Sequence, residues 1–393
     1  MGYNFPALYF EATRRCNLNC PLCMTGSNDS HKVRAKRPHE LNFDEIRELV
    51  LLPAKRLGVM AIGWSGGEFL IRNDALDLLR LTTEMGFQCK VCSNGELLDR
   101  SKLQEIKEAT NGKVTISVGL NAVDDRNEWS RDVKPDRTLE VLELCDELKI
   151  DRHVIVTISK DNTESFADTI KYLTDRRISY NRAPYVARGS GCDLFKDLAF
   201  DRGDLENHFH PELRSSVNGY VSYTPFFLSP ELHDEVSGGA ANGTVPQNPP
   251  IGCWAGTWLA LNAEGDVSVC PVLLDVLKAG NVRERPLDEL VASSKMFADV
   301  LDRSKLTGKC GDCRYQYTCG GCRAMAYYHT GDYMGEDPTC FFDPVDRSTV
   351  SEHEEETNRN FKKYLLVARA AGVYKPPGDR RSGRPPLPVE KGN

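Results

Sequence analysis

The sequence predicts an α/β protein with a partial (β/α)6 barrel, similar to a TIM barrel, followed by a small cysteine-rich domain. Three observations predict this organisation. Short apolar runs alternate with amphipathic helical patterns over the first 190 residues, three cysteines directly follow the first of these runs, and seven more lie in residues 253–340. With 393 residues, of which 40% are hydrophobic, the chain is long enough to build a core in each part.

Six short runs, bounded by turn-forming residues, have the composition of β-strands. They are residues 8–11, 59–64, 87–92, 113–118, 153–158 and 178–185. The segments between them have the apolar spacing of helices, and in "NFDEIRELVLL" we expect Asn42 to cap the helix and Glu45 to complete a capping box. Regular alternation predicts parallel strands with right-handed crossovers, and six such units predict a partial barrel.

Composition excludes several classes of protein. No apolar run has the length of a membrane span, and "MGYNFPALYF" has neither the charged start nor the cleavage site of a signal peptide. We therefore expect a soluble cytoplasmic protein without a membrane partner. The net charge of −7 argues against general affinity for nucleic acid, so no nucleic-acid partner is expected.

Fourteen cysteines in a chain without export signals indicate metal ligands, because cytoplasmic thiols are kept reduced. Cys16, Cys20 and Cys23 form a C-x3-C-x2-C motif directly after the first predicted strand, at the mouth of the barrel. Thiolates are good ligands for iron, and a [4Fe-4S] cluster takes one ligand for each iron. Three cysteines leave one iron open to bind a reactant, as catalytic zinc sites keep one position open.

The cysteine motif, its place after the first strand and the strand-end motifs that follow resemble those of the radical S-adenosylmethionine (SAM) enzymes. The resemblance implies that the open iron binds the amino and carboxylate groups of SAM. It also implies that an electron from the cluster cleaves SAM to methionine and a 5'-deoxyadenosyl radical, which removes a hydrogen atom from the substrate.

The resemblance also assigns SAM contacts at the ends of successive strands. "WSGGEFL" is similar to the family's motif for the methionine amino group, with a phenylalanine in place of the usual proline; "CSNGE" and "ISVGLNA" are placed near the ribose, and an arginine near the methionine carboxylate. "YVARGSG" resembles a late barrel motif beside the SAM site. The residues implied are Gly66, Gly67, Glu68, Ser93, Asn94, Ser117 and Arg131. Taken alone, Gly66 and Gly67 predict only a turn, and Ser117 only a polar strand residue.

The second cysteine-rich region begins with "CWAGTWLALNAEGDVSVC". This segment predicts two short strands joined by a turn at Glu264 and Gly265, which brings Cys253 and Cys270 together. "CGDCRYQYTCGGC" follows, and Cys340 comes later. The alternative is a structural zinc ribbon, but its two CxxC pairs normally lie much farther apart than they do here.

These seven cysteines resemble the SPASM extension of radical SAM enzymes, which holds two auxiliary iron-sulfur clusters, and the resemblance covers residues 7–343. It implies an outer [4Fe-4S] cluster on Cys310, Cys313, Cys319 and Cys340. An inner cluster would use Cys253, Cys270 and Cys322, with one iron lacking an evident cysteine. For Cys192 three roles remain open: the missing ligand, a hydrogen-atom donor, or a plain buried thiol.

"GCWAG" and "CGGCRA" resemble most the branch that edits tetrapyrrole side chains in haem and haem d1 biosynthesis, and some peptide-maturing enzymes share this signature. We expect an oxidoreductase that acts on a small-molecule intermediate. Flavodoxin or ferredoxin is expected to reduce the enzyme. Because fifteen residues precede the first clustered cysteine, we expect no leader-peptide domain before the barrel. The alternatives are a maturase of a ribosomally made precursor peptide and a non-catalytic iron-sulfur electron carrier.

The predicted domain organisation follows from these segments. It has a radical SAM core barrel, a connector or lid whose aromatic residues include Tyr223 and Phe226, an auxiliary-cluster domain, a C-terminal helix and a disordered tail. Their bounds are 1–190, 191–252, 253–345, 346–374 and 375–393.

Overall fold

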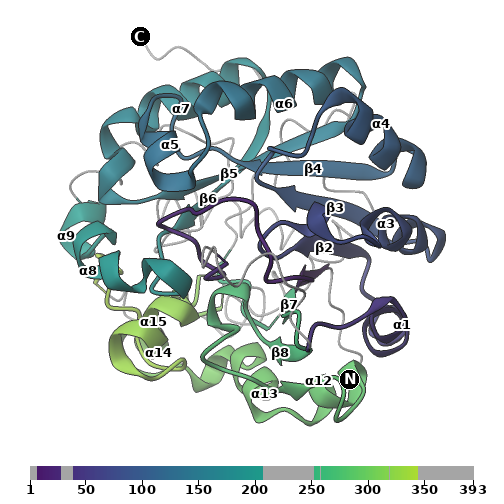
Figure 1. Cartoon of the computed structure of the whole chain (residues 1–393). Coiled ribbons are helices and arrows are strands. Elements are labelled where there is room, and N and C mark those ends of the chain that lie inside the picture. Colours follow the sequence, from purple (N-terminus) through teal and green to yellow (C-terminus); the bar gives the residue numbers. More distant parts are fainter. Residues whose placement is uncertain (1–6, 28–38, 207–251, 257, 318, 344–393) are drawn as a thin grey trace, which may run out of the picture.

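A computed structural model describes residues 7–27, 39–206, 252–256, 258–317 and 319–343. Figure 1 shows the whole chain. Most of the expected connector, the expected C-terminal helix and the expected tail lie outside the described residues.

The described part of the chain contains one nine-stranded sheet with the order β6-β5-β4-β3-β2-β1-β7-β8-β9. Strands β1 to β6 pair in parallel with their sequence neighbours, which confirms the six predicted strands and their crossovers. The barrel-type strands are Ala7–Glu11 (β1), Ala61–Ser65 (β2), Gln88–Ser93 (β3), Val114–Gly119 (β4), Asp151–Ile158 (β5) and Ser179–Pro184 (β6).

Helices connect these strands, and Figure 1 shows α3, α4, α6 and α7 around the outside of the sheet. The longer ones are Ala75–Glu84 (α3), Arg100–Ala109 (α4), Pro135–Glu147 (α6) and Thr163–Asp175 (α7). Shorter pieces are Phe69–Ile71 (η2), Arg126–Arg131 (α5), Lys160–Asn162 (η3), Gly189–Leu194 (η4), Phe195–Leu198 (α8) and Arg202–Asp204 (α9).

The first helical segment begins as predicted. The Glu45 backbone N–H donates to the Asn42 side chain at 3.0 Å, and the Asn42 N–H donates back to the Glu45 carboxylate at 2.9 Å. This capping box satisfies donors that have no partner within the helix. The segment consists of Phe43–Glu45 (α1), the wider π-helical turn Ile46–Leu51 (η1) and Leu52–Arg56 (α2).

The two faces of the sheet differ in chemistry. Residues that point toward the outer helices, such as Leu8, Phe10 and Trp64, are fully buried in the apolar core. Each such side chain contributes about 1.5–3 kcal/mol of hydrophobic stabilisation. Phe69, at the position where the family's motif has proline, joins this core by stacking on Trp64 with ring centroids 5.0 Å apart. The opposite, inner face carries polar residues at the alternating positions, including Tyr9 hydrogen-bonded to Ser65.

The C-terminal cysteine-rich part is attached directly to this sheet. Trp258–Leu261 (β7) pairs in parallel with β1, and Asp266–Ser268 (β8) and Gly280–Asn281 (β9) extend the sheet in antiparallel fashion. The predicted hairpin turn is confirmed, with Gly265 at φ +95°, a conformation that favours glycine. The remaining elements are Pro271–Leu273 (η6), Leu287–Ser293 (α12), Lys295–Leu301 (α13), Arg303–Lys305 (η7), Gly308–Asp312 (α14) and Arg323–Thr330 (α15).

Among the described residues, no helix has both the length and the apolar character needed to cross a membrane.

Candidate active site

The cysteine loop, residues 12–27, starts where β1 ends and carries the three clustered cysteines. The Cys20 thiol donates a hydrogen bond to the Arg131 carbonyl at 2.8 Å, and the Asn94 amide donates to the Cys16 sulfur at 3.8 Å. Asn94 lies in the loop after β3, and Arg131 is the last residue of α5, in the connection that follows β4. The loop is therefore held over the carboxyl end of the parallel strands, where the sequence placed it.

The three thiols form one electrostatic group. Burial raises the pKa of the Cys16 thiol to about 11 and that of Cys20 to about 12. Cys23 raises both values further, and the Arg131 cation opposes the rise at Cys20. Without a metal, thiolates are disfavoured in such surroundings, and bound iron supplies the positive charge that stabilises them.

Two glycines allow the loop after β2 to pack backbone to backbone on the cysteine loop. The Gly67 N–H donates to the Thr13 carbonyl at 2.8 Å, and the Glu68 N–H donates to the Arg15 carbonyl at 2.7 Å. A Cβ atom at Gly66 would lie 2.3 Å from the Thr13 oxygen, and one at Gly67 would lie 2.2 Å from the Arg15 oxygen. Any larger residue at either position would push the two loops apart.

Glu68 joins the loops after β2 and β3. Its fully buried carboxylate accepts hydrogen bonds from the Ser93 hydroxyl at 3.0 Å, from the Asn94 N–H at 2.8 Å and from the Leu70 N–H at 3.1 Å. Burial raises the pKa of this carboxyl group, although the three donors favour the ionised form. The structure thus brings Glu68, Ser93 and Asn94 together, and a contact between Glu68 and the SAM amino group stays a prediction.

Arg131 lies over the end of β4. A Cβ atom at Gly119 would be only 1.9 Å from the Arg131 guanidinium carbon, so a glycine is needed for the arginine to take this place. The following residue, Asp132, accepts a hydrogen bond from the Asn19 N–H of the cysteine loop at 2.8 Å. The predicted arginine therefore does lie beside the cysteine loop, where a SAM carboxylate is expected.

Ser117 lies deeper than the other predicted contacts, two residues before the end of β4. Its hydroxyl is 3.0 Å from His153 Nδ1, and Lys90 Nζ is 3.2 Å from the same nitrogen. Cys92 is its neighbour on β3. Neither Lys90 nor His153 was predicted as a site residue; the signal in the sequence was a lysine at an alternating position in the strand "QCKVCS".

The late barrel motif, residues 185–191, packs directly on the cysteine loop. The Ser190 N–H donates to the Cys23 carbonyl at 3.0 Å. Gly189 has φ +66°, and a Cβ atom there would lie 2.3 Å from the same carbonyl oxygen. Backbone groups of this motif therefore border the cysteine loop, and a place beside SAM, which the resemblance implies, stays a prediction.

Four cysteines of the C-terminal part line one cavity. Arg323 donates a hydrogen bond to the Cys310 sulfur at 3.5 Å, and the Asp337 N–H donates to it at 3.4 Å. The cavity also contains Tyr315, Gln316 and Phe342 in its wall. Its cysteines are those proposed for the outer cluster: Cys310, Cys313, Cys319 and Cys340.

The three cysteines proposed for the inner cluster are also neighbours. Burial raises the pKa of Cys270 to about 12 and that of Cys322 well above its ordinary value, and the charge of Cys253 raises both further. Cys270 and Cys322 both pack against the small buried cluster that contains Cys253, so the hairpin brings Cys253 and Cys270 together as predicted. Asp337 accepts a hydrogen bond from the Cys322 N–H at 2.7 Å, and Arg303 donates to the Cys253 carbonyl at 2.9 Å.

Cys192 lies in η4 and is exposed. The interpretation of this residue as a plain buried thiol is wrong, because η4 leaves the barrel on its surface. The Tyr185 hydroxyl donates to the carbonyl of the adjacent Gly191, and Phe195, directly after η4, lies near Tyr328 with ring centroids 6.5 Å apart, so η4 lies beside the late barrel motif and α15.

The donor set fits iron-sulfur clusters. None of the fourteen cysteines forms a disulfide. Within the described ranges, no group of three or more His, Cys, Asp or Glu residues is arranged around a single metal ion. A four-iron cluster requires a different arrangement, because each thiolate binds a different iron atom.

Fold and site together are those of the class of iron-sulfur enzymes in which a three-cysteine loop lies at the open edge of a parallel sheet. The Radical SAM superfamily model matches residues 10–173, and the SPASM iron-sulfur cluster-binding domain model matches residues 253–314. This chain therefore contains a radical SAM domain followed by a SPASM domain. Its cofactors are SAM and iron-sulfur clusters.

Relatives of known name agree with this domain content. The AdoMet-dependent heme synthase of Methanosarcina barkeri (strain Fusaro / DSM 804) is 28% identical and covers 87% of this chain and 98% of its own length. The PqqA peptide cyclase of Bradyrhizobium diazoefficiens is 24% identical over 95% of this chain and 96% of its own. The crystal structure of Streptococcus suis SuiB bound to S-adenosylmethionine shares the fold, with a TM-score of 0.61 at 19% identity, over 86% of this chain and 78% of that chain.

Proposed function

We propose that this protein is a radical SAM oxidoreductase that removes a hydrogen atom from a small-molecule biosynthetic intermediate and oxidises the resulting radical through its auxiliary clusters. One observation carries this proposal. The loops after β2, β3, β4 and β6 all contact the cysteine loop, through Gly67, Asn94, Arg131 and Ser190. A chain that only carried electrons would not need four strand-end loops around a three-cysteine site.

The residues have separate roles in this proposal. Cys16, Cys20 and Cys23 hold the first cluster, and the guanidinium of Arg131 faces the carboxylate of SAM. Glu68 fixes the loop that presents Asn94. When bound, the cluster and SAM together supply the electron and the 5'-deoxyadenosyl radical.

We assign Cys310, Cys313, Cys319 and Cys340 to the outer auxiliary cluster because they line one cavity. Cys253, Cys270 and Cys322 hold the inner cluster in this proposal, because they pack together in one small cluster of side chains. Flavodoxin or ferredoxin serves as the proposed reductant.

For the substrate we favour an iron tetrapyrrole with propionate side chains. The heme synthase relative is aligned over 98% of its length, which supports this choice. The inner face of the sheet also places the ammonium group of Lys90 next to His153, and a cation there suits a substrate with carboxylates. A precursor peptide is the second candidate, since another relative is named for a peptide.

The test uses the reconstituted full-length protein with dithionite and SAM. We expect 5'-deoxyadenosine, and a faster rate together with loss of hydrogen or of a carboxyl group when an iron tetrapyrrole with propionate side chains is added. The variant with all three clustered cysteines replaced by Ala is the control. A protein that exchanges electrons but never forms 5'-deoxyadenosine contradicts the proposal. Stimulation by a precursor peptide alone transfers the substrate assignment to peptides.

A further inference from the structure

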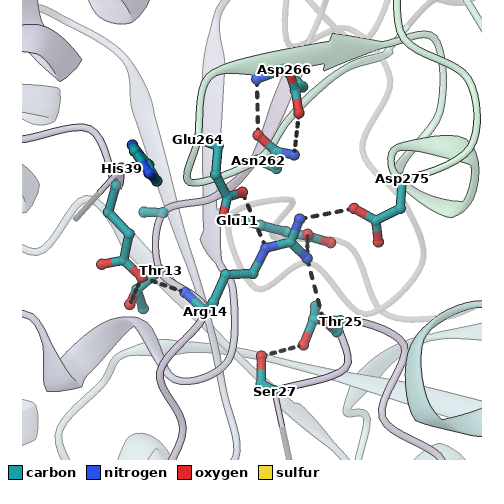
Figure 2. Close-up of polar contacts among 12 residues, drawn as sticks. Glu11, Thr13, Arg14, Thr25, Ser27, His39, Asn262, Glu264, Asp266 and Asp275 are labelled. Carbon is teal, nitrogen blue, oxygen red and sulfur yellow. Dashed lines mark hydrogen bonds and ion pairs between the residues drawn. The ribbon is translucent and has the colours of Figure 1, made fainter. Parts of the chain in front are cut away.

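Four charged side chains form a closed ring between the barrel and the C-terminal part. Arg188 donates to both oxygens of Glu11, at 2.6 and 2.8 Å, and its Nε donates to Asp275 at 2.8 Å. Arg14 donates to the other oxygen of Asp275 at 2.8 Å, and its Nη1 lies 3.5 Å from Glu11. Figure 2 shows Arg14 between Glu11, Asp275 and a further partner, Glu264. We call Glu11, Arg14, Arg188 and Asp275 the charge ring.

The charge ring connects segments that are distant in sequence. Arg14 precedes Cys16 by two residues, and Arg188 belongs to the late barrel motif. Asp275 follows Cys270 by five residues and is 261 positions from its partner Arg14. The ring therefore ties the loop of the first cluster to the segment that carries a proposed ligand of the inner auxiliary cluster.

Stability alone does not explain this arrangement. The side chains of Glu11 and Arg188 are 0% and 1% exposed, so both charges have lost their hydration. Apolar residues of similar volume usually hold buried segments together at least as well as an ion pair does. What the ring provides beyond cohesion is a fixed geometry and a set of oriented charges next to the cysteines.

The charge ring lies close to the proposed ligand. Cys270 is the N-cap of η6, and the Leu273 N–H donates to the Cys270 carbonyl at 3.1 Å, so one tight turn separates Cys270 from Asp275. Tyr328 of α15 donates to the Val272 carbonyl of this turn at 2.8 Å, and Arg188 reaches the end of the turn through its hydrogen bond to Asp275. Net charge and polar contacts around an iron-sulfur cluster set its reduction potential, because added negative charge on reduction is stabilised by a nearby cation.

We propose that the charge ring holds the inner auxiliary cluster in place against the loop of the first cluster and sets its midpoint potential. Arg188 raises this potential and Asp275 lowers it, so both are positioning residues that act through the cluster's surroundings. The inference rests on the proposed assignment of Cys270 as a ligand.

The experiment is a redox titration of the reconstituted full-length enzyme, followed by the electron paramagnetic resonance signals of the auxiliary clusters. Arg188→Gln is expected to lower the midpoint potential of one auxiliary cluster by about 59 mV or more, a tenfold change in a one-electron equilibrium. Asp275→Asn is expected to raise it. Loosening of the structure would move both variants in the same direction, so opposite signs identify an electrostatic role.

Two further variants serve as controls. Arg188→Lys keeps the charge, so the one-electron equilibrium of the auxiliary cluster should change less than threefold from the wild type. If Arg188→Gln does not fold, Arg188→Lys and Asp275→Asn together decide the question. Arg72→Gln removes another buried guanidinium, which pairs with Asp74 at 2.7 Å and donates to the Ala12 carbonyl at 2.8 Å, and should leave the auxiliary potentials unchanged.

Unchanged potentials in both ring variants, or shifts of the same sign, overturn the inference. The variant Cys270→Ala distinguishes a wrong ligand assignment from a wrong role of the charge ring. If that variant keeps all auxiliary iron, the assignment itself is wrong. If it loses one cluster while the ring variants keep their potentials, only the role of the ring is wrong.

Discussion

The two cysteine regions of this protein are built differently. The first places three cysteines within eight positions of one loop, and all three are half-buried at the open edge of the sheet. The second collects seven cysteines over residues 253–340 from a hairpin, two short helices and the loops between them. Three of these, Cys253, Cys310 and Cys319, are buried. The cysteines of the first region are neighbours in one loop that the barrel holds. Those of the second region come together only when residues 253–340 have folded.

Removing the first region's ligands tests this independence most strongly. Replacing Cys16, Cys20 and Cys23 by Ala should remove about four irons, one [4Fe-4S] cluster, and abolish SAM cleavage. The auxiliary iron should persist, because no auxiliary cysteine lies on that loop. Iron analysis and 5'-deoxyadenosine formation measure the two effects. Loss of all iron would show that the regions assemble together.

Gly67→Ala disturbs the backbone contact that supports the cysteine loop and leaves all cysteines in place. The new methyl group would meet the Arg15 carbonyl at 2.2 Å, which displaces the cysteine loop. We expect SAM cleavage to fall by more than tenfold while the auxiliary iron content is kept. Gly203→Ala is the matched control, since its methyl group would meet only the Asp201 side chain at 3.4 Å. Full activity of Gly67→Ala would show that the two loops need not be in contact.

Lys90→Met probes the inner face beneath the first region. Loss of the ammonium group beside His153 should reduce substrate-dependent kcat/KM by about tenfold, which corresponds to about 1.4 kcal/mol. Uncoupled cleavage of SAM should be unchanged, because Lys90 lies deeper than the cysteine loop. An equal decrease of both rates would mean that Lys90 supports the fold instead of the substrate.

Arg323→Met tests the second region. Arg323 is fully buried, and it donates to the carbonyls of Tyr333 and Gly335 and to the Cys310 sulfur. Losing these bonds should destabilise the C-terminal part by about 2–3 kcal/mol. The unfolding temperature and the iron content of the outer cluster should both decrease, and the first cluster should be retained. If only the first cluster is lost, the comparison between the regions fails.

Cys192→Ala should have the smallest effect. Cys192 is exposed and lies outside both groups of cysteines, so we expect the cluster iron content to stay at the wild-type value. Iron and sulfide analysis of the reconstituted variant measures this. The disappearance of one auxiliary cluster would identify Cys192 as its missing ligand.

Local patterns predicted the elements that depend on neighbours in sequence. The six barrel strands, the Asn42 capping box and the turn at Gly265 all follow from periodicity and from turn or capping residues within a few positions. The cysteine spacings indicated which thiols lie together for the same reason. Gly66 and Gly67 were selected by resemblance, and the structure adds the physical cause, which is the close backbone of Thr13 and Arg15.

Contacts between distant segments were not predictable in this way. The partners of Arg14 and Arg188 are carboxylates up to 261 positions away, and one sequence gives no means of pairing them. The position of Ser117 was also missed in part, because motif order places it at a strand end and the register of β4 places it two residues deeper. The exposure of Cys192 depends on the path of η4, which no periodic pattern in the sequence predicts.

The pairing of β1 with β7 has a consequence for how the chain is made. β1 has β2 on one side and β7 on the other, so one neighbour comes from residues 61–65 and the other from residues 258–261. During synthesis, the first strand of the barrel therefore exposes one edge until residues 258–261 have been made. An unpaired strand edge is a template for association with other chains. The nascent protein thus depends on β7 to close the edge of β1.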